Sequence, residues 1–279
     1  MPLRALSNAS VVHLVGALTM LLSVPSSVQR AADPPLVTVV ARDHAFEAPD
    51  TLRAGVTRFR LRDLGPTKHQ LVIYRLADSV SLKEFYDAMK VGRASPAGIR
   101  SLGGAQEAED ISIVLAPGRY VFACMHGFED GTSHLSRGMF RAFTVIRGAD
   151  GSTDAVPPKA DATLTMSDYT YKLTGELAPG RRVLRIVNAG PQEHHVMIQR
   201  LMPGRTITDV ERWFAAGRRT ERPVMPIFWG TTRQSPGETL YATIDVTAGG
   251  YILLCRVPDS GDGRPHVDHG MRGEIRVAE

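Results

Sequence analysis

Residues 65–76 read GPTKHQLVIYRL and residues 190–201 read GPQEHHVMIQRL, so one pattern occurs twice without a gap. Each copy opens with a Gly-Pro turn, has a histidine at its fifth residue, and continues into a run rich in β-branched residues. Self-similarity at a fixed offset indicates that one structural unit is present twice. The fold of the chain therefore depends on how far this repeat extends.

The repeat extends well downstream of these two stretches. LAPGRYVFAC at 115–124 corresponds to VTAGGYILLC at 246–255, and HLSRGM at 134–139 corresponds to HVDHGM at 266–271. The offset between the copies grows from 125 to 131 and then to 132 residues. Such slow growth indicates small insertions in loops, where insertions are tolerated.

Two domains follow from this repeat, at residues 36–147 and 160–279, with a linker rich in Gly, Pro and Asp at 148–159. Each domain contains short segments that are rich in β-branched and aromatic residues and are separated by Gly and Pro turns. Regular short strands of this kind predict an all-β fold, with an antiparallel sandwich in each domain.

One short helix interrupts the strands of each domain. The predicted helices begin at Ser81 and at Thr208, each followed three residues later by a glutamate, which is the spacing of a capping box. Each predicted helix ends at a glycine, Gly92 in the first domain and Gly217 in the second.

The first thirty-two residues have the layout of a secretory signal. Arg4 precedes an apolar run at 11–24, and small residues and a break follow. The run is shorter than the roughly 18–20 apolar residues that span a bilayer. We predict that residues 1–32 are a cleaved signal peptide, and that the mature protein is secreted or periplasmic without membrane contact. An uncleaved anchor is the alternative, because Gln29-Arg30 is not a clean small-x-small cleavage site.

The mature chain is nearly neutral. Removal of residues 1–32 leaves 31 basic against 29 acidic residues, a net charge of +2, compared with +4 for the whole chain. This balance does not support nucleic acid or a membrane surface as a partner. The 22% of charged and 43% of hydrophobic residues are ordinary for a packed globular protein and argue against wholesale disorder.

Four donor residue types recur in one order in both domains: a histidine and then, after a long gap, a cysteine, a histidine and a methionine. A thiolate and two imidazoles form a trigonal donor set, and a thioether supplies a weak axial contact, as in blue-copper sites. Each cysteine closes a strand, and the loop that follows returns histidine and methionine to the same end of the sandwich. The candidate copper ligands are His69, Cys124, His134 and Met139 in the first domain and His194, Cys255, His266 and Met271 in the second.

In these motifs the sequence resembles the cupredoxin family, with GP..H at the strand start, APGRYVFAC at the cysteine and H-x4-M at the close. Nine residues separate cysteine from histidine in the first repeat and ten in the second. Loops of this length are similar to that of the first domain of copper nitrite reductases. The resemblance covers both repeats. It implies two tandem Greek-key cupredoxin-like β-sandwiches, each with an electron-transfer copper at one end.

The sequence departs from the enzymes of this superfamily directly before each cysteine. Nitrite reductases and multicopper oxidases bind catalytic copper through extra histidines, one of them at that position. Here the position holds Ala123 and Leu254. We therefore predict no catalytic residues, and single-electron transfer through type 1 (blue) copper to or from a redox protein partner. Two alternatives stay open: a non-redox scaffold or copper carrier in which one or both sites have lost metal, and an oxidase- or nitrite-reductase-like enzyme.

Other residues could change the ligand assignment. A disulfide between Cys124 and Cys255 is the rival interpretation for an exported protein. It requires the two Cα atoms to lie within about 7 Å, which only a favourable domain interface would give. His126 and His269 each lie beside a proposed ligand in one repeat only, and either could replace the assigned histidine.

Four further polar residues near the proposed ligands have simpler interpretations. His195 directly follows a proposed ligand and is expected to face the other way along the strand. His44 lies in a predicted turn. Asp259 and Asp262 are expected to be turn formers in the Cys-to-His loop, and a hard-cation site built from them is the alternative.

Overall fold

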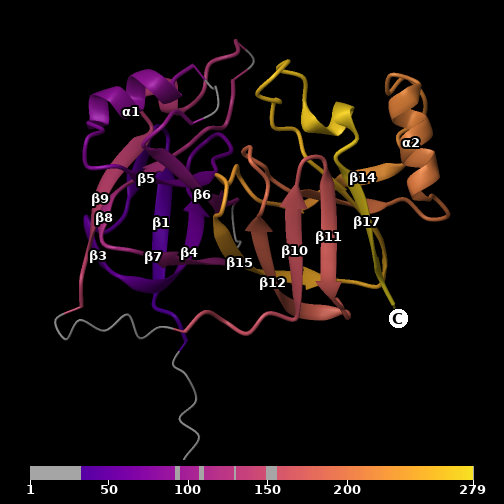
Figure 1. Ribbon diagram of the computed structural model, residues 1–279, viewed down its shortest axis with the longest axis horizontal. Helices are drawn as coiled ribbons and strands as arrows, with labels where there is room; N and C mark the ends of the chain where they lie inside the picture. The colour runs from indigo at the N-terminus through magenta and orange to yellow at the C-terminus, as the bar shows by residue number, and fades with distance from the viewer. Residues whose placement is uncertain (1–32, 92–94, 107–109, 129, 149–155, 279) are drawn as a thin grey trace, which may run out of the picture. The chain divides into compact units, whose positions relative to one another are not determined.

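The structure is a computed structural model that describes residues 33–91, 95–106, 110–128, 130–148 and 156–278 (Figure 1). Within these ranges the chain forms strands, two α-helices and two short 3₁₀ helices. The predicted all-β class, with one short α-helix in each repeat, is confirmed. The predicted signal peptide lies outside the described residues.

The strands of the first repeat divide between two sheets. One sheet holds β7, β4, β1 and β2 side by side, and the other has the order β3-β9-β8-β5-β6. The elements are β1 (Leu36–Arg42), β2 (Ala45–Glu47), β3 (Thr51–Arg53), β4 (Gly55–Asp63), β5 (Leu71–Leu76), α1 (Leu82–Met89), β6 (Ile99–Ala105), β7 (Asp110–Leu115), β8 (Gly118–Ala123), η1 (Leu135–Arg137) and β9 (Phe140–Ile146).

The second repeat has a corresponding division. One sheet holds β11, β10, β12 and β15, and the other has the order β14-β13-β16-β17. The elements are β10 (Ala162–Ser167), β11 (Thr170–Gly175), β12 (Gly180–Asn188), β13 (Met197–Leu201), α2 (Ile207–Ala215), β14 (Val224–Gly230), β15 (Thr239–Val246), β16 (Gly249–Leu254), η2 (His266–His269) and β17 (Arg272–Val277).

The strands are not all antiparallel, contrary to the prediction. The pairs β1–β4, β10–β12 and β3–β9 are parallel. Along the chain, β2 lies between β1 and β4 and forms an antiparallel hairpin with β1. In the second repeat β11 lies between β10 and β12 and forms the same kind of hairpin with β10. The parallel pairing is non-local, so the alternation of side chains along each strand does not reveal it.

Strands of the two repeats also pair with each other. β7 is antiparallel to β15, with Ile113 opposite Leu240 and Asp110 opposite Thr243. The result is one eight-stranded sheet in the order β11-β10-β12-β15-β7-β4-β1-β2. One hydrophobic core cluster contains buried residues of both repeats, and residues 32–279 group into a single unit. The predicted boundaries at 147 and 160 remain a prediction from the repeat.

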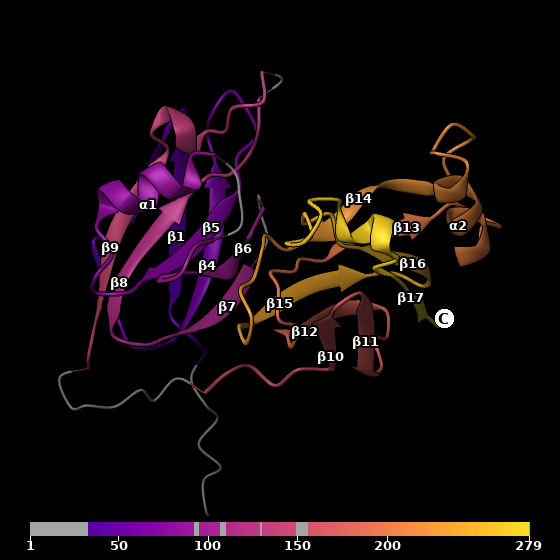
Figure 2. The ribbon, with the colours of Figure 1, turned by 45° about the horizontal axis from the view of Figure 1, so that its top comes forward.

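Each helix covers one face of the sheet of its own repeat that is not part of the eight-stranded sheet (Figure 2). Phe85 and Met89 of α1 are buried against Tyr74 and Val121. Val210 of α2 is buried against Val224 and other apolar residues of its sheet.

The capping box of α1 is confirmed, and that of α2 lies elsewhere than predicted. The Ser81 hydroxyl accepts from the backbone N–H of Glu84, whose carboxylate accepts from the backbone N–H of Ser81. In the second repeat the N-cap is Thr206, paired with Asp209 in the same way. The assignment of Thr208 as the N-cap was therefore wrong, because the helix begins two residues earlier.

The predicted ends of the helices have different outcomes. Gly217 follows the last residue of α2 with φ at +64°, the left-handed conformation that favours glycine after a helix. Gly92 lies outside the described residues.

Candidate metal centres

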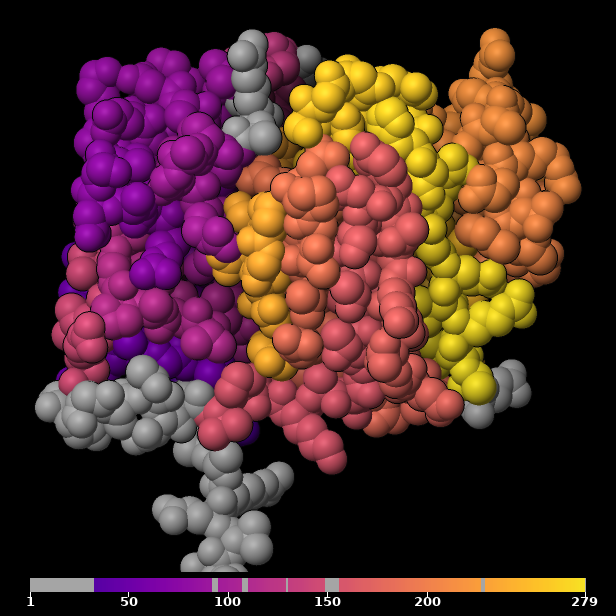
Figure 3. All heavy atoms as spheres, in the orientation of Figure 1, coloured from indigo at the N-terminus to yellow at the C-terminus, as the bar shows by residue number. Residues whose placement is uncertain are grey.

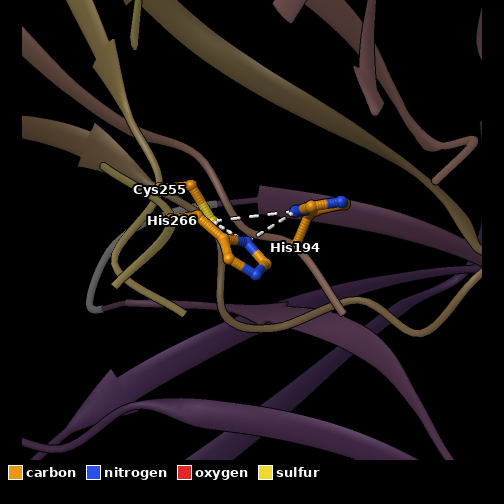
Figure 4. A group of neighbouring side chains, drawn as sticks. All are labelled: His194, Cys255 and His266. Atoms are coloured by element: carbon orange, nitrogen blue, oxygen red, sulfur yellow. Dashed lines mark hydrogen bonds between the residues drawn. The ribbon is translucent and has the colours of Figure 1, made fainter. Parts of the chain in front are cut away.

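Three donor atoms of the second repeat converge on one point (Figure 4). Nδ1 of His194 lies 3.0 Å from Nδ1 of His266, and Sγ of Cys255 lies 3.9 Å and 3.5 Å from these two nitrogens. A first-row metal ion in trigonal coordination, with bonds of about 2.0–2.3 Å, holds its donors about 3.5 Å apart. The three separations bracket that value, so the donors fit a single ion.

The backbone of the loop between β16 and β17 brings these donors together. The N–H of Val267 donates to the carbonyl of Cys255, and the N–H of Cys255 donates to the carbonyl of Met271. The N–H of Met271 in turn donates to the carbonyl of His266. Both Cys255 and Met271 are fully buried. Met271 is thus tied through its backbone to both Cys255 and His266.

Asp168 orients the His194 ring. The Nε2 atom donates to a carboxylate oxygen of Asp168 at 2.5 Å, which leaves the lone pair of Nδ1 directed at the other donors. A Cβ atom on Gly190 would lie 2.7 Å from Nε2. The glycine of the GP..H motif is therefore required because the histidine ring lies against it.

The protonation of these groups suits a metal centre. Burial lowers the pKa of His194, although the hydrogen bond to Asp168 acts in the opposite direction. The pKa of His266 is also lowered, mainly by burial and to a smaller extent by the charge of His194. Neutral imidazoles can coordinate metal. Burial raises the pKa of the Cys255 thiol to about 11. A metal ion must therefore displace the thiol proton when it binds.

The first repeat has the same backbone frame but a different histidine arrangement. The backbone N–H of Leu135 donates to the carbonyl of Cys124, and the N–H of Cys124 donates to the carbonyl of Met139. The N–H of Met139 in turn donates to the carbonyl of His134. Cys124, His134 and Met139 are fully buried, and Sγ of Cys124 accepts from the backbone N–H of Gln70 at 3.4 Å. Three of the four predicted residues therefore occupy positions that correspond to those of the second repeat.

His69, the fourth predicted ligand of the first repeat, is engaged on both ring nitrogens. Nδ1 lies 2.7 Å from a carboxylate oxygen of Asp63, and Nε2 lies 2.6 Å from the backbone carbonyl of Asp43. Both partners are oxygen acceptors, so both ring nitrogens of His69 are engaged outside the predicted quartet. Among the described residues, His69, Cys124 and His134 do not form a group of three close ligand atoms as the second repeat does.

Asp63 is the residue that makes the upstream histidine of the first repeat differ in orientation from that of the second. Burial alone would raise the pKa of its carboxyl, but hydrogen bonds from the His69 ring and from the backbone of Gly65 and His69 outweigh burial and lower it. The corresponding residue of the second repeat is Asn188, whose Nδ2 donates to the carbonyls of Gln192 and Gln234. A neutral amide turned toward backbone carbonyls does not draw the histidine ring away from the donors.

Both cysteines of the chain are free, so the disulfide interpretation is wrong. Among the described residues, two groups of His, Cys, Asp or Glu bring three ligand atoms within 4.8 Å of one another. The first is the His194, Cys255 and His266 group. The second is Asp259, Asp262 and His269.

Hydrogen bonds account for the second group. Asp259 accepts from the hydroxyl of Tyr169 and from the side chain of Gln192, and Asp262 lies 3.0 Å from Nε2 of His269. The loop of residues 256–265 is thereby tied to the β10–β11 turn, and Figure 3 shows the yellow end of the chain against these salmon-coloured strands. These acids have structural partners of the kind expected for turn formers.

The neighbouring histidines fall into two classes. His195 accepts from the backbone N–H of Arg256 through Nε2, and burial lowers its pKa to about 3. It takes no part in the donor group. His44 and His126 of the first repeat, by contrast, lie against the ring of His134.

Sequence reasoning missed the two aspartates that orient the histidine rings. Asp43 and Asp168 recur at the same offset as His69 and His194, which marked them as members of the repeat without indicating what they contact. The difference between Asp63 and its counterpart was also visible in the aligned repeats, but only the structure shows that it changes a ring orientation.

No protein-family model matches the chain, and no curated protein sequence matches it. Among solved structures it is similar to a dithionite-reduced auracyanin from Roseiflexus castenholzii, at 19% identity and a TM-score of 0.28, over 42% of this chain and 95% of that one. A blue copper oxidase from Nitrosomonas europaea is similar at 12% identity and a TM-score of 0.24, over 88% of this chain and 86% of that one.

A copper-containing nitrite reductase from Thermus scotoductus is similar at 13% identity and a TM-score of 0.24, over 87% of this chain and 61% of that one. All three TM-scores are low, and the case for copper in this chain comes from its own donor geometry. No helix of the described residues is long and apolar enough to cross a bilayer.

Proposed function

We propose that this chain is an exported copper protein that passes single electrons to or from a redox protein partner. The proposal rests on the convergence of His194, Cys255 and His266 on one buried point, with Met271 beside them. Two imidazoles, a thiolate and a thioether are the donor set of electron-transfer copper sites. Copper would supply a one-electron couple there.

The protein residues would keep the site rigid and dry. The Asp168 carboxylate holds the His194 ring, and backbone hydrogen bonds fix Cys255 and Met271. The Tyr169 ring lies 5.3 Å from that of His266, between centroids, and covers it. Donors held in one arrangement limit the reorganisation that accompanies a change of redox state. No water-filled position for a substrate is required by this role.

The second repeat would carry this function alone. Its donor group fits copper, whereas His69 of the first repeat has both ring nitrogens engaged by acceptors. We therefore expect one thiolate-bound copper per chain. Export is proposed from the sequence layout of residues 1–32.

Copper reconstitution tests the proposal. Cu(II) added to the folded chain is expected to give one intense thiolate-to-copper absorption band in the visible, and voltammetry is expected to show a reversible one-electron couple. Cys255→Ser should abolish the band. Cys124→Ser is the matched control, because Cys124 is equally buried at the end of the corresponding strand. A colourless sample, or copper held only as Cu(I), would contradict electron transfer.

A further inference from the structure

The ring of His134 has no hydrogen-bond partner among the described residues. Its side chain is fully buried, and neither Nδ1 nor Nε2 makes a hydrogen bond. Buried polar groups nearly always have partners, so an orphaned pair on one ring points to a missing ligand.

Three other imidazoles surround this ring. The centroids of His69, His44 and His126 lie 4.8, 5.5 and 5.6 Å from that of His134. His69 is committed to Asp63 and to a backbone carbonyl. His44 and His126 are exposed side chains that can turn about their own bonds. His44 and His126 are therefore the neighbouring histidines whose side chains can rotate.

The spacing of the rings suits coordination of one ion. A metal–nitrogen bond is about 2.0–2.1 Å, so a ligand ring centroid lies about 3.1 Å from the metal, and two such rings at a tetrahedral angle have centroids about 5 Å apart. His44 and His126 are within about half an ångström of that separation from His134. As placed, the ligand atoms of the three histidines do not all lie within 4.8 Å of one another. Rotations of the exposed His44 and His126 side chains would have to bring them together.

The second repeat lacks these imidazoles. At the positions that correspond to His44 and His126 it has Tyr169 and Val257, and neither is a metal ligand of this kind. The additional imidazoles of His44 and His126 thus occur in the repeat whose upstream histidine has both ring nitrogens engaged by acceptors. The ring of Phe128 stacks on His134 at 4.4 Å between centroids and fixes its plane.

Two cations act on this cluster, Lys68 on His126 and Arg137 on His134, and Arg137 is already paired. Arg137 lies over the Phe128 ring, 3.5 Å from its centroid, and forms an ion pair with Asp130 at 2.8 Å. Its charge is partly offset by that carboxylate. A divalent ion at His134 therefore does not face an uncompensated positive charge from this side.

We propose that the first repeat binds a divalent metal ion through His44, His126 and His134, without the Cys124 thiolate. Imidazole-only sites suit zinc and copper, and Cu(II) binds such donors most tightly among the divalent first-row ions. The chain then carries two metal centres of different chemistry. The second site is independent of the proposed electron-transfer function, since it uses none of the residues around Cys255.

Titration of the metal-free, full-length chain with Cu(II) tests the second site. Two equivalents are expected to bind, one with the thiolate band and one without it. The second equivalent should show a paramagnetic resonance spectrum with nitrogen coupling. His44→Ala and His126→Ala should each weaken that equivalent by tenfold or more and leave the thiolate band unchanged. Both residues are exposed, so the fold should persist, as circular dichroism can check.

His69→Gln and Cys124→Ser are the matched controls and should leave the second equivalent in place. Loss of that equivalent in either control, with retention in the His44 and His126 variants, would show instead that the quartet predicted from sequence binds the metal. Binding of a single equivalent would also overturn the proposal. A failure of the electron-transfer proposal is separate, because it would appear as a missing thiolate band.

Discussion

At the scale of single residues, one carboxylate decides whether a histidine faces a metal site. Asp63 and Asn188 occupy corresponding positions, and both accept from the backbone N–H of the glycine two residues later. Only Asp63 also binds the upstream histidine, through Nδ1 of His69. In the second repeat the same nitrogen of His194 faces the donors instead. The difference is one of charge and hydrogen-bonding direction rather than of backbone position.

Substitution Asp63→Asn should release His69. An amide cannot form the charge-assisted bond that holds Nδ1, so the ring gains freedom to turn toward Cys124 and His134. We expect the thiolate-to-copper absorbance per chain to rise toward twice the wild-type value in a copper-saturated sample. Asp50→Asn, which removes an exposed carboxylate paired with Arg141, is the control and should leave the absorbance unchanged.

An unchanged absorbance in the Asp63→Asn variant, with the protein folded, would mean that something other than Asp63 keeps His69 away from the donors.

Substitution Asp168→Asn tests the orientation of the second-repeat histidine. Loss of the carboxylate on Nε2 of His194 should weaken copper binding by about 10–100-fold, as is usual when the partner of a ligand histidine is removed. Competition with a chelator of known affinity would measure it. Equal affinity in the variant and the wild type would show that the ring is held by packing alone.

The sequence predicts which residue types meet in the second repeat but not how each ring turns. The order His, Cys, His, Met places four residues at one end of a sandwich in both repeats. It carries no information on the rotation about the side-chain bonds of His69 or His194. That rotation depends on partners such as Asp63 and Asp168, which come from other strands or their ends.

At the scale of secondary-structure elements, the start of α2 shows how a cap is selected. Both Thr206 and Thr208 have an acidic residue three positions later. The side chain of Thr206 accepts from the backbone N–H of Asp209, and the Asp209 carboxylate accepts from the backbone N–H of Thr206. The prediction considered Thr208 only, and the spacing of a hydroxyl and an acid does not by itself decide which threonine caps the helix.

Thr206→Ala should therefore lower the free energy of unfolding by about 1 kcal/mol, the usual effect of removing an N-cap hydroxyl. Thr208→Ala, at an exposed position inside the first turn, should have a much smaller effect. Denaturant titration of both variants measures the difference. An equal decrease in the free energy of unfolding for both variants would contradict the assignment of Thr206 as the N-cap.

The same cap makes a pH-dependent contribution. Hydrogen bonds from Thr206, first from its backbone and then from its side chain, lower the pKa of Asp209 below 3.8. A carboxyl whose folded pKa is depressed stabilises the fold above its unfolded pKa and loses that contribution as the pH falls through the folded value. The stability difference between wild type and Asp209→Asn should therefore be constant near neutrality and shrink below about pH 4. A difference that grows on acidification would contradict this.

At the scale of the whole molecule, the pairing of β7 with β15 joins the two repeats. Their strands form one eight-stranded sheet, and a single core cluster draws on both. The sequence pattern does not predict this pairing, because alternation along a strand specifies which face is buried and not which strand lies beside it. The Gly-, Pro- and Asp-rich composition of residues 148–159 predicted a linker between two separate domains. Composition of this kind does not show which strands pair across the linker.

A shared sheet and core predict one cooperative unfolding transition for the folded chain. Scanning calorimetry should give a van't Hoff enthalpy equal to the calorimetric enthalpy. Copper bound at the second repeat should move the whole transition upward, since a ligand of the folded state stabilises every part that unfolds with it. Two resolved transitions, of which copper shifts one, would show that the repeats unfold separately.

The complete burial of Cys124 and Cys255 bears on the chemical reactivity of the metal-free chain. Burial raises the pKa of both thiols to about 11, so almost no thiolate exists at neutral pH for oxidants or alkylating reagents to attack. The fold itself therefore protects both thiols from reagents in the solvent. Both thiols should resist iodoacetamide until the fold is opened by denaturant.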